Sequence, residues 1–182
     1  MPKKVFNNSD YNSGDGMLTS IWGPPLWHAL HTISFNYPVK PTKEQKDNYY
    51  NFFKNLRHVL PCKYCRENLK KNLQVVPLKK STFKNRDSLS KWVYNLHETV
   101  NKMLGKKSGL SYNDIRERYE NFRARCLEKK VNNKKEKGCT DSLYGLKGKC
   151  IMNIVPKNSK KETFKINSKC KIKRNKRNKK ND

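Results

Sequence analysis

One stretch, Leu60-Pro61-Cys62-Lys63-Tyr64-Cys65, constrains the fold more than any other because a helix boundary and a cysteine pair coincide in it. An apolar helical pattern ends just before Pro61, and Cys62 suits the cap of a new helix. The start of a helix offers unpaired N–H groups and the positive end of a dipole, which favour a thiolate over a thiol. Two residues between the cysteines let both sulfurs lie on one turn, so the motif predicts a reversible dithiol–disulfide pair.

Half of a zinc site is the alternative interpretation of this motif. A structural zinc site usually needs a second cysteine pair at matching spacing, and the other four cysteines are single. A zinc-stabilised interaction module would have to use Cys139, Cys150 and Cys170, with Cys126 or a histidine as fourth ligand. The spacing therefore favours redox chemistry over zinc.

Prolines and capping residues delimit the first two predicted helices. Pro24 and Pro25 suit the first turn of a helix that ends before Pro38. Thr42 caps a second helix, in which Gln45 completes a capping box and apolar residues recur at helical spacing up to residue 60. Both segments are long enough to form the framework of a bundle.

Two pairs of polar and aromatic residues lie one turn apart beside the apolar stripes. Trp27 and His31 are one pair, and His97 and Asn101 in a later helix are the other. For Trp27 and His31 the spacing alone favours core packing with a hydrogen-bonded imidazole over contact with a ligand.

Three further helices follow from the apolar spacing. One covers residues 62–73, and a polar connection spans residues 74–85. The next runs from near Asp87, or a cap at Ser88, to Gly105, and the last runs from Ser111 or Asn113 to about residue 126. No convincing strand pair appears in residues 21–126, so we predict an all-α fold, a four-helix bundle with a short fifth helix.

The 182 residues divide by composition into three parts. We expect a flexible arm over residues 1–20, one helical domain over residues 21–126 and a basic tail over residues 127–182. In that tail the apolar residues between 138 and 156 are too few to predict more than a short hairpin. A largely irregular, solvated tail is the favoured interpretation.

The net charge of +27 is concentrated in the tail. Residues 1–126 carry 23 Lys/Arg and 10 Asp/Glu, or +13, whereas residues 127–182 carry 19 and 5, or +14. Such a charge favours anionic partners, namely nucleic acid, anionic lipid or acidic proteins. The competing functional hypothesis is therefore a basic nucleic-acid-binding protein with a structural C-x-x-C motif.

Targeting patterns are not evident in the sequence. No apolar run is long enough to span a bilayer, and residues 1–20 have neither the apolar stretch of a signal peptide nor an Arg-rich amphipathic pattern. We therefore expect cysteine chemistry in a protein that is not exported.

Four motifs occur in a specific order: Trp22-Gly23-Pro24-Pro25-Leu26-Trp27-x-x-Leu30-His31, Tyr37-Pro38-x-x-Pro41-Thr42, Pro61-Cys62-x-x-Cys65-Arg66, and Trp92-x-x-x-x-His97-x-x-Val100-Asn101-x-x-Leu104-Gly105-Lys106. Together they resemble the ERV/ALR family of FAD-dependent sulfhydryl oxidases over about residues 21–126. The resemblance implies a helical bundle that holds FAD with its ring system beside the C-x-x-C motif.

Cofactor contacts are carried over by position in the motifs. The resemblance implies flavin contacts on the first and fourth helices, phosphate and ribose contacts after the fourth helix, and adenine contacts on the fifth. The implied flavin contacts are Gly23, Trp27, His31, Tyr37, His97 and Asn101. The implied phosphate and ribose contacts are Lys102, Leu104 and Lys106, and the implied adenine contacts are Arg118 and Tyr119. Aromatic faces, imidazoles and lysines suit a flat apolar ring system and a pyrophosphate. The resemblance therefore favours ligand contact for Trp27 and His31.

The sequence departs from the family pattern at two points. Glu98 stands where many members have asparagine, which puts a cofactor contact from that position in doubt. The helix after the C-x-x-C motif also lacks the extra cysteines that staple some members. The small number of cysteines and the opening motif Trp-Gly-Pro-Pro-Leu-Trp look most like those of members encoded by large DNA viruses. This likeness implies the host cytoplasm or the virion as location.

The resemblance also implies an activity. Cys62 would receive electrons from protein thiols, and Cys65 would pass them to FAD and then to oxygen, giving hydrogen peroxide. Family members commonly pair through their first helices, so a homodimer is expected. Many members also carry a second, mobile cysteine pair, and Cys139 and Cys150, separated by ten residues, are the candidates for such a shuttle.

Overall fold

The computed structural model describes residues 7–127, 138–161 and 166–170. It divides the chain into two compact units, Met1–Ser108 and Gly109–Asp182, and each is described by itself.

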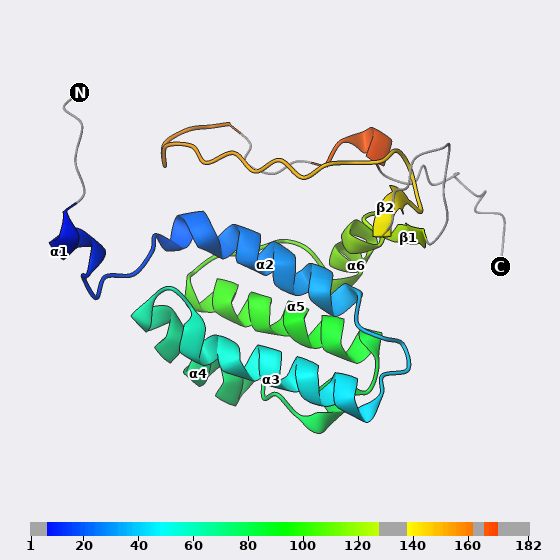
Figure 1. Ribbon diagram of the computed structural model, residues 1–182, viewed down its shortest axis with the longest axis horizontal. Coiled ribbons are helices and arrows are strands. Elements are labelled where there is room, and N and C mark those ends of the chain that lie inside the picture. Colours follow the sequence, from blue (N-terminus) through cyan, green and yellow to red (C-terminus); the bar gives the residue numbers. More distant parts are fainter. Residues whose placement is uncertain (1–6, 128–137, 162–165, 171–182) are drawn as a thin grey trace. The chain divides into compact units, whose positions relative to one another are not determined.

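The first unit is a helical bundle built from α2 (Thr19–Phe35), α3 (Lys43–Val59), α4 (Lys63–Val75) and α5 (Arg86–Met103). Two short helices accompany them, α1 (Asn8–Tyr11) and the 3-10 helix η1 (Lys80–Phe83). Helix α5 packs against α2 and α4, and α4 packs against α3, so α5 lies between α2 and the other two long helices (Figure 1). The predicted all-α bundle is confirmed.

The core of the bundle gathers around α5, which is buried along one stripe. Leu89 and Val93 are wholly buried, and aromatic rings from α3 and η1 pack on the same side. The full buried cluster comprises Leu30, Tyr37, Phe53, Leu56, Leu69, Phe83, Leu89, Trp92, Val93 and Leu96. Burial of this apolar area is the main stabilising term of the unit.

Helix α2 begins earlier than the sequence predicted. Pro24 and Pro25 lie inside the helix, and not in its first turn. The first turn forms at Leu18, whose carbonyl accepts from the backbone N–H groups of Ile21 and Trp22 at 2.9 and 3.3 Å. The helix therefore continues into the proline pair, although neither proline has an N–H to donate. The predicted flexible arm also contains α1, capped by Asn7.

Capping chemistry was predicted well at α3 and less well at α5. The capping box of α3 is present, with Thr42 N–H donating to Gln45 Oε1 at 2.9 Å and Gln45 N–H to Thr42 Oγ1 at 3.2 Å. The cap of α5 is Asn85, and neither Asp87 nor Ser88. The Asn85 side-chain oxygen accepts from both the backbone N–H and the hydroxyl of Ser88 at 2.9 Å, which explains the earlier start.

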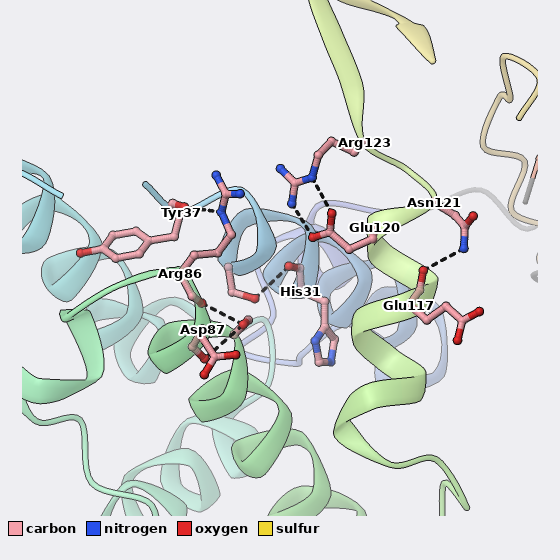
Figure 2. A network of polar contacts seen from close by, with 10 residues as sticks. His31, Tyr37, Arg86, Asp87, Glu117, Glu120, Asn121 and Arg123 are labelled. Carbon is pink, nitrogen blue, oxygen red and sulfur yellow. Dashed lines mark hydrogen bonds and ion pairs between the residues drawn. The ribbon is translucent and has the colours of Figure 1, made fainter. Parts of the chain in front are cut away.

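The connection expected to be polar contains buried structure. Thr82 and Phe83 in η1 are buried, because Phe83 packs on the bundle core. The Tyr37 hydroxyl donates to the Phe83 carbonyl at 3.0 Å. Figure 2 shows the second bond, in which the Arg86 Nε donates to the Tyr37 carbonyl at 2.7 Å. These two bonds join the end of α2 to η1 and to the start of α5.

The second unit contains α6 (Tyr112–Glu120), β1 (Ala124–Leu127), β2 (Gly138–Ser142) and the 3-10 helix η2 (Ser168–Cys170). The strands pair antiparallel, with Ala124 opposite Ser142 and Leu127 opposite Gly138. The sequence prediction of helix up to residue 126, without strands, was therefore wrong at this end. The short hairpin considered as an alternative within residues 138–156 is not what β2 forms, because β2 pairs with β1.

Side chains at the end of α6 explain why the helix stops. Asn121 follows the helix, and its Nδ2 donates to the Glu117 carbonyl at 2.8 Å (Figure 2). Arg123 donates to both carboxylate oxygens of Glu120, at 2.8 and 2.6 Å. A side chain that satisfies the last carbonyls competes with continuation of the helix.

We predict that Tyr37→Phe lowers the free energy of unfolding by about 1–3 kcal/mol, because the buried Phe83 carbonyl loses its donor. Tyr11→Phe is the control, since Tyr11 is 88% exposed and its hydroxyl is solvated. Urea denaturation of both variants measures the difference. Equal stability of the two would mean that this hydrogen bond does not hold η1 in place.

Candidate dithiol site and the aromatic cluster on α2 and α5

The two cysteines of the motif lie at the start of α4, as the sequence predicted. Cys62 is the N-cap, in extended conformation with φ −146° and ψ 126°, and Cys65 lies in the first turn. The Cys65 backbone N–H donates to Cys62 Sγ at 3.3 Å. Both cysteines are half-buried free thiols. The sulfur of Cys62 is therefore the side-chain acceptor that caps the start of α4.

The two sulfurs of this pair are not equivalent. Hydrogen bonds from the Cys65 thiol and backbone N–H lower the pKa of Cys62 below its ordinary value. Burial, followed by the hydrogen bond to Cys62 and the charge on it, raises the pKa of Cys65. The pair therefore holds its first negative charge on Cys62, at the positive end of α4.

The loop before α4 is fixed by its own backbone. Leu60 O accepts from the Cys62 backbone N–H at 2.8 Å and from Arg66 Nη1 at 2.6 Å. The guanidinium of Arg66 thus folds back over the helix start. This closes the turn that presents Cys62.

A cluster of one indole and two imidazoles lies where α2 packs on α5. Trp27 stacks on His97 with ring centroids 4.0 Å apart and planes 5° from parallel. His31 Nε2 and His97 Nδ1 are 3.0 Å apart, a hydrogen-bond distance. Burial lowers the pKa of His97 to about 4, so this imidazole is neutral at neutral pH.

Helix α2 links the dithiol to this cluster. Thr19, Gly23, Trp27 and His31 recur every four residues and so lie along one face of the helix. Thr19 Oγ1 is 4.0 Å from Cys65 Sγ, at one end of the row. Gly23 is buried, and a Cβ atom there would have only Thr19 Cγ2, at 3.7 Å, within 4 Å. A methyl group would therefore fit beside the backbone at this point of the row, between the dithiol and the aromatic rings.

The remaining residues predicted on the bundle lie at other places. Tyr37 is wholly buried in the core, with its hydroxyl bonded to Phe83. Asn101 is half-buried, and its Nδ2 donates to Glu98 Oε1 at 2.9 Å. Glu98 therefore orients the side-chain amide of Asn101, which was predicted to contact the flavin. Lys102, Leu104 and Lys106 are exposed at the end of α5. Gly105 turns the chain there with φ 67°, and Lys106 N–H donates to Asn101 O at 2.8 Å.

Arg118 and Tyr119 lie on α6 in the second unit. Tyr119 is buried, and burial raises its pKa to about 12. Their contact with a cofactor stays a prediction.

The tail cysteines are not arranged as the sequence suggested. Cys139 is disulfide-bonded, whereas Cys150 is a free thiol, so these two are not joined. Cys170 is also free, and its Sγ lies 3.4 Å from where a Cβ atom on Gly148 would be. Cys170 is therefore a free thiol close to Gly148, and it was not among the predicted shuttle cysteines.

In the part of the chain that the structure describes, no three side chains of His, Cys, Asp or Glu group as metal ligands would. No helix in the described residues has the length and apolar content needed to cross a membrane.

Thr19 and the residues just before it were not among the predicted site residues. Thr19 precedes Gly23 by one turn, and its contact with Cys65 depends on the early start of α2. A residue four positions before Gly23 would lie on the same face of a helix, and this spacing was the available signal. Pro24 and Pro25 instead suggested that the helix began after residue 19.

Comparison with known proteins gives consistent matches. The family model described as Erv1 / Alr family matches residues 24–120. A probable FAD-linked sulfhydryl oxidase of Acanthamoeba polyphaga mimivirus is 40% identical over 91 residues, which are 50% of this chain and 64% of the relative. An FAD-linked sulfhydryl oxidase of African swine fever virus is 30% identical over 107 residues, 59% of this chain and 87% of the relative.

Solved structures of yeast Erv1 are among the matches. The crystal structure of the yeast Erv1 core has a TM-score of 0.51 and 25% identity, and the match covers 65% of this chain and 94% of that one. The FAD-binding domain of Erv1 from Saccharomyces cerevisiae matches with the same TM-score, 27% identity, and coverage of 57% and 94%. The chain spans 64% of the mimivirus relative and 42% of an Arabidopsis thaliana FAD-linked sulfhydryl oxidase.

We predict that iodoacetamide alkylates Cys62 before Cys65 in the reduced, folded protein at neutral pH. The pKa of Cys62 is lowered and that of Cys65 is raised, so Cys62 has the larger thiolate fraction at any pH between them. Peptide mass spectrometry after a short pulse measures the order. The protein unfolded in urea is the control, where the two should react alike. Faster labelling of Cys65 in the folded protein would contradict the assignment.

Proposed function

Because the chain belongs to the Erv1/Alr family, we propose that it is an FAD-linked sulfhydryl oxidase that forms disulfides in protein thiols and uses oxygen as electron acceptor. One observation carries the proposal most directly. A dithiol at a helix start and a stacked indole–imidazole cluster lie along the same face of α2. Both the mimivirus and the African swine fever virus relatives bear the name of this activity.

The dithiol half of the reaction uses Cys62 and Cys65. A substrate thiolate attacks Cys62 Sγ of the oxidised pair, the S–S bond breaks, and Cys65 leaves as thiolate with the electron pair. A second substrate thiol then displaces Cys62 from the mixed disulfide. Two substrate thiols thus lose two electrons and two protons, and the protein pair becomes a dithiol. The lowered pKa of Cys62 supports its role as the sulfur exchanged with substrate.

The residues on α2 and α5 fit a flavin. The space beside Gly23 and the stacked faces of Trp27 and His97 suit a flat apolar ring system. His31 and His97 hold each other in place through their hydrogen bond, and a neutral His97 presents either a donor or an acceptor to the ring's polar edge. Lys102 and Lys106 supply positive charge for the pyrophosphate. Bound FAD supplies two-electron redox chemistry between the dithiol and oxygen, with hydrogen peroxide as product.

Finer proposals concern partners and location. The basic tail, with 19 Lys/Arg against 5 Asp/Glu in residues 127–182, supports binding of nucleic acid or another polyanion, although residues 171–182 lie outside the described residues. The viral relatives support the host cytoplasm or the virion as location. Pairing of two copies through α2, and a shuttle that involves Cys150, rest on the family resemblance.

We predict that His97→Ala lowers both the flavin content of the purified protein and its melting temperature, because a ligand that binds only the folded state stabilises it. His58→Ala is the matched control, since His58 is an exposed histidine on α3. The absorbance spectrum and a thermal melt with and without added FAD measure both effects. Full flavin content in His97→Ala would contradict the assignment of the cluster.

We predict that Cys62→Ser and Cys65→Ser each reduce oxidation of dithiothreitol to background, while FAD stays bound. Loss of either sulfur prevents the disulfide from forming, whereas neither belongs to the aromatic cluster. Cys150→Ser is the control and should keep full turnover, since dithiothreitol is small enough to reach Cys62 directly. Oxygen consumption measures turnover. Retained activity in either motif variant would remove the dithiol from the mechanism.

A further inference from the structure

The residues just before α2 lie against the dithiol loop. We call residues 16–18, together with Thr19 at the start of α2, the strap; they precede residue 24, where the match to the family model begins. The Met17 backbone N–H donates to the Pro61 carbonyl at 2.9 Å. The contact joins positions 44 residues apart in the sequence, so it is a tertiary contact of this chain and not a local turn.

Close approach at Gly16 makes this contact specific. A Cβ atom at Gly16 would lie 2.6 Å from the Pro61 carbonyl oxygen and 3.2 Å from Cys62 Cα. Both neighbours are backbone atoms, so no side-chain rotation relieves the clash. A Cβ atom added at Gly14, two residues earlier, would have no such atom within 4 Å. Only glycine fits at residue 16, whereas residue 14 has no such requirement.

The strap is also held from the helix side. The Trp22 indole Nε1 donates to the Met17 carbonyl at 3.0 Å, and Leu18 is the residue from which α2 begins. Met17 therefore uses its N–H on the dithiol loop and its carbonyl on α2. Thr19, the next residue but one, enters the first turn of α2 with Oγ1 at 4.0 Å from Cys65 Sγ.

We propose that the strap holds the dithiol loop in place and that Thr19 is a positioning residue whose hydroxyl donates a hydrogen bond to Cys65 Sγ in the reduced pair. The inference deepens the proposed function, because Cys65 is the sulfur that leaves with the electron pair when the disulfide is opened. A donor at Cys65 favours the reduced form of the pair over the disulfide. Consistent with this, the Thr19 hydroxyl acts to lower the pKa of both cysteines.

The experiment measures the redox equilibrium of Cys62 and Cys65 against glutathione, without oxygen, in the full chain as purified. Thiols are trapped by alkylation, and the fraction reduced is read by peptide mass spectrometry. We expect Thr19→Val to shift the equilibrium toward the disulfide by about three- to tenfold, since a hydrogen bond made to Cys65 in the reduced pair is lost. Thr19→Ser keeps the hydroxyl and should restore the original equilibrium. Equal values for Thr19→Val and the unaltered protein would overturn the role of Thr19.

The glycine pair tests the strap independently. We expect Gly16→Ala to lower the melting temperature and to shift the equilibrium in the same direction as Thr19→Val, because the added Cβ displaces the strap from Pro61. Gly14→Ala should change neither quantity. Identical behaviour of the two alanine variants would overturn the strap.

These measurements are separate from the proposed function. Neither the redox equilibrium nor the melting temperature requires oxidase turnover. A protein that shows the Thr19 and Gly16 effects but fails to oxidise dithiothreitol would keep the strap and lose the oxidase assignment. An active oxidase without these effects would do the reverse.

Discussion

Proline at position 61 ends α3 and leaves backbone carbonyls that no helix can satisfy. The carbonyl of Leu60 accepts from the Cys62 N–H and from Arg66, and that of Pro61 accepts from Met17. Each partner comes from a different place, the loop itself, helix α4 and the segment before α2. The break at Pro61 therefore exposes two carbonyls that hydrogen-bond to three parts of the bundle beside the cysteine pair. Because α4 starts directly after this break, Cys62 is its N-cap.

The aromatic cluster of Trp27, His31 and His97 depends on a regular spacing along α2 and on one packing contact. Residues at intervals of four lie on one face, so Thr19, Trp27 and His31 point the same way. Packing of α2 on α5 then brings His97 against Trp27, and burial costs the charged imidazole its solvation. The charge on Glu98 acts in the opposite direction and raises the pKa of His97, but the effect of burial is larger. A neutral His97 is the expected result.

Local signals predicted the parts of the fold that local chemistry decides. The Thr42 capping box, the break at Pro61 and the turn at Gly105 each depend on residues within one helical turn, and all three are present. The start of α2 was mispredicted because Leu18 and Trp22 form the first turn despite the prolines that follow. Strand β1 could not be predicted from its own residues, because its partner β2 lies more than ten residues further along the chain. The contact between Met17 and Pro61 has no sequence signal except the glycine that permits it.

The position of the dithiol relative to the aromatic cluster is set by the core and by the two ends of α4. At its start, the bonds to the carbonyls of Leu60 and Pro61 hold the helix. At its other end, the Trp92 indole donates to the Val76 carbonyl at 3.3 Å, and Trp92 belongs to the buried stripe of α5. A helix held at both ends cannot slide along its neighbours without breaking one of these bonds. The same α5 carries His97, so the core residue that anchors α4 and the imidazole of the cluster move together, and the separation of sulfur and ring system follows from packing.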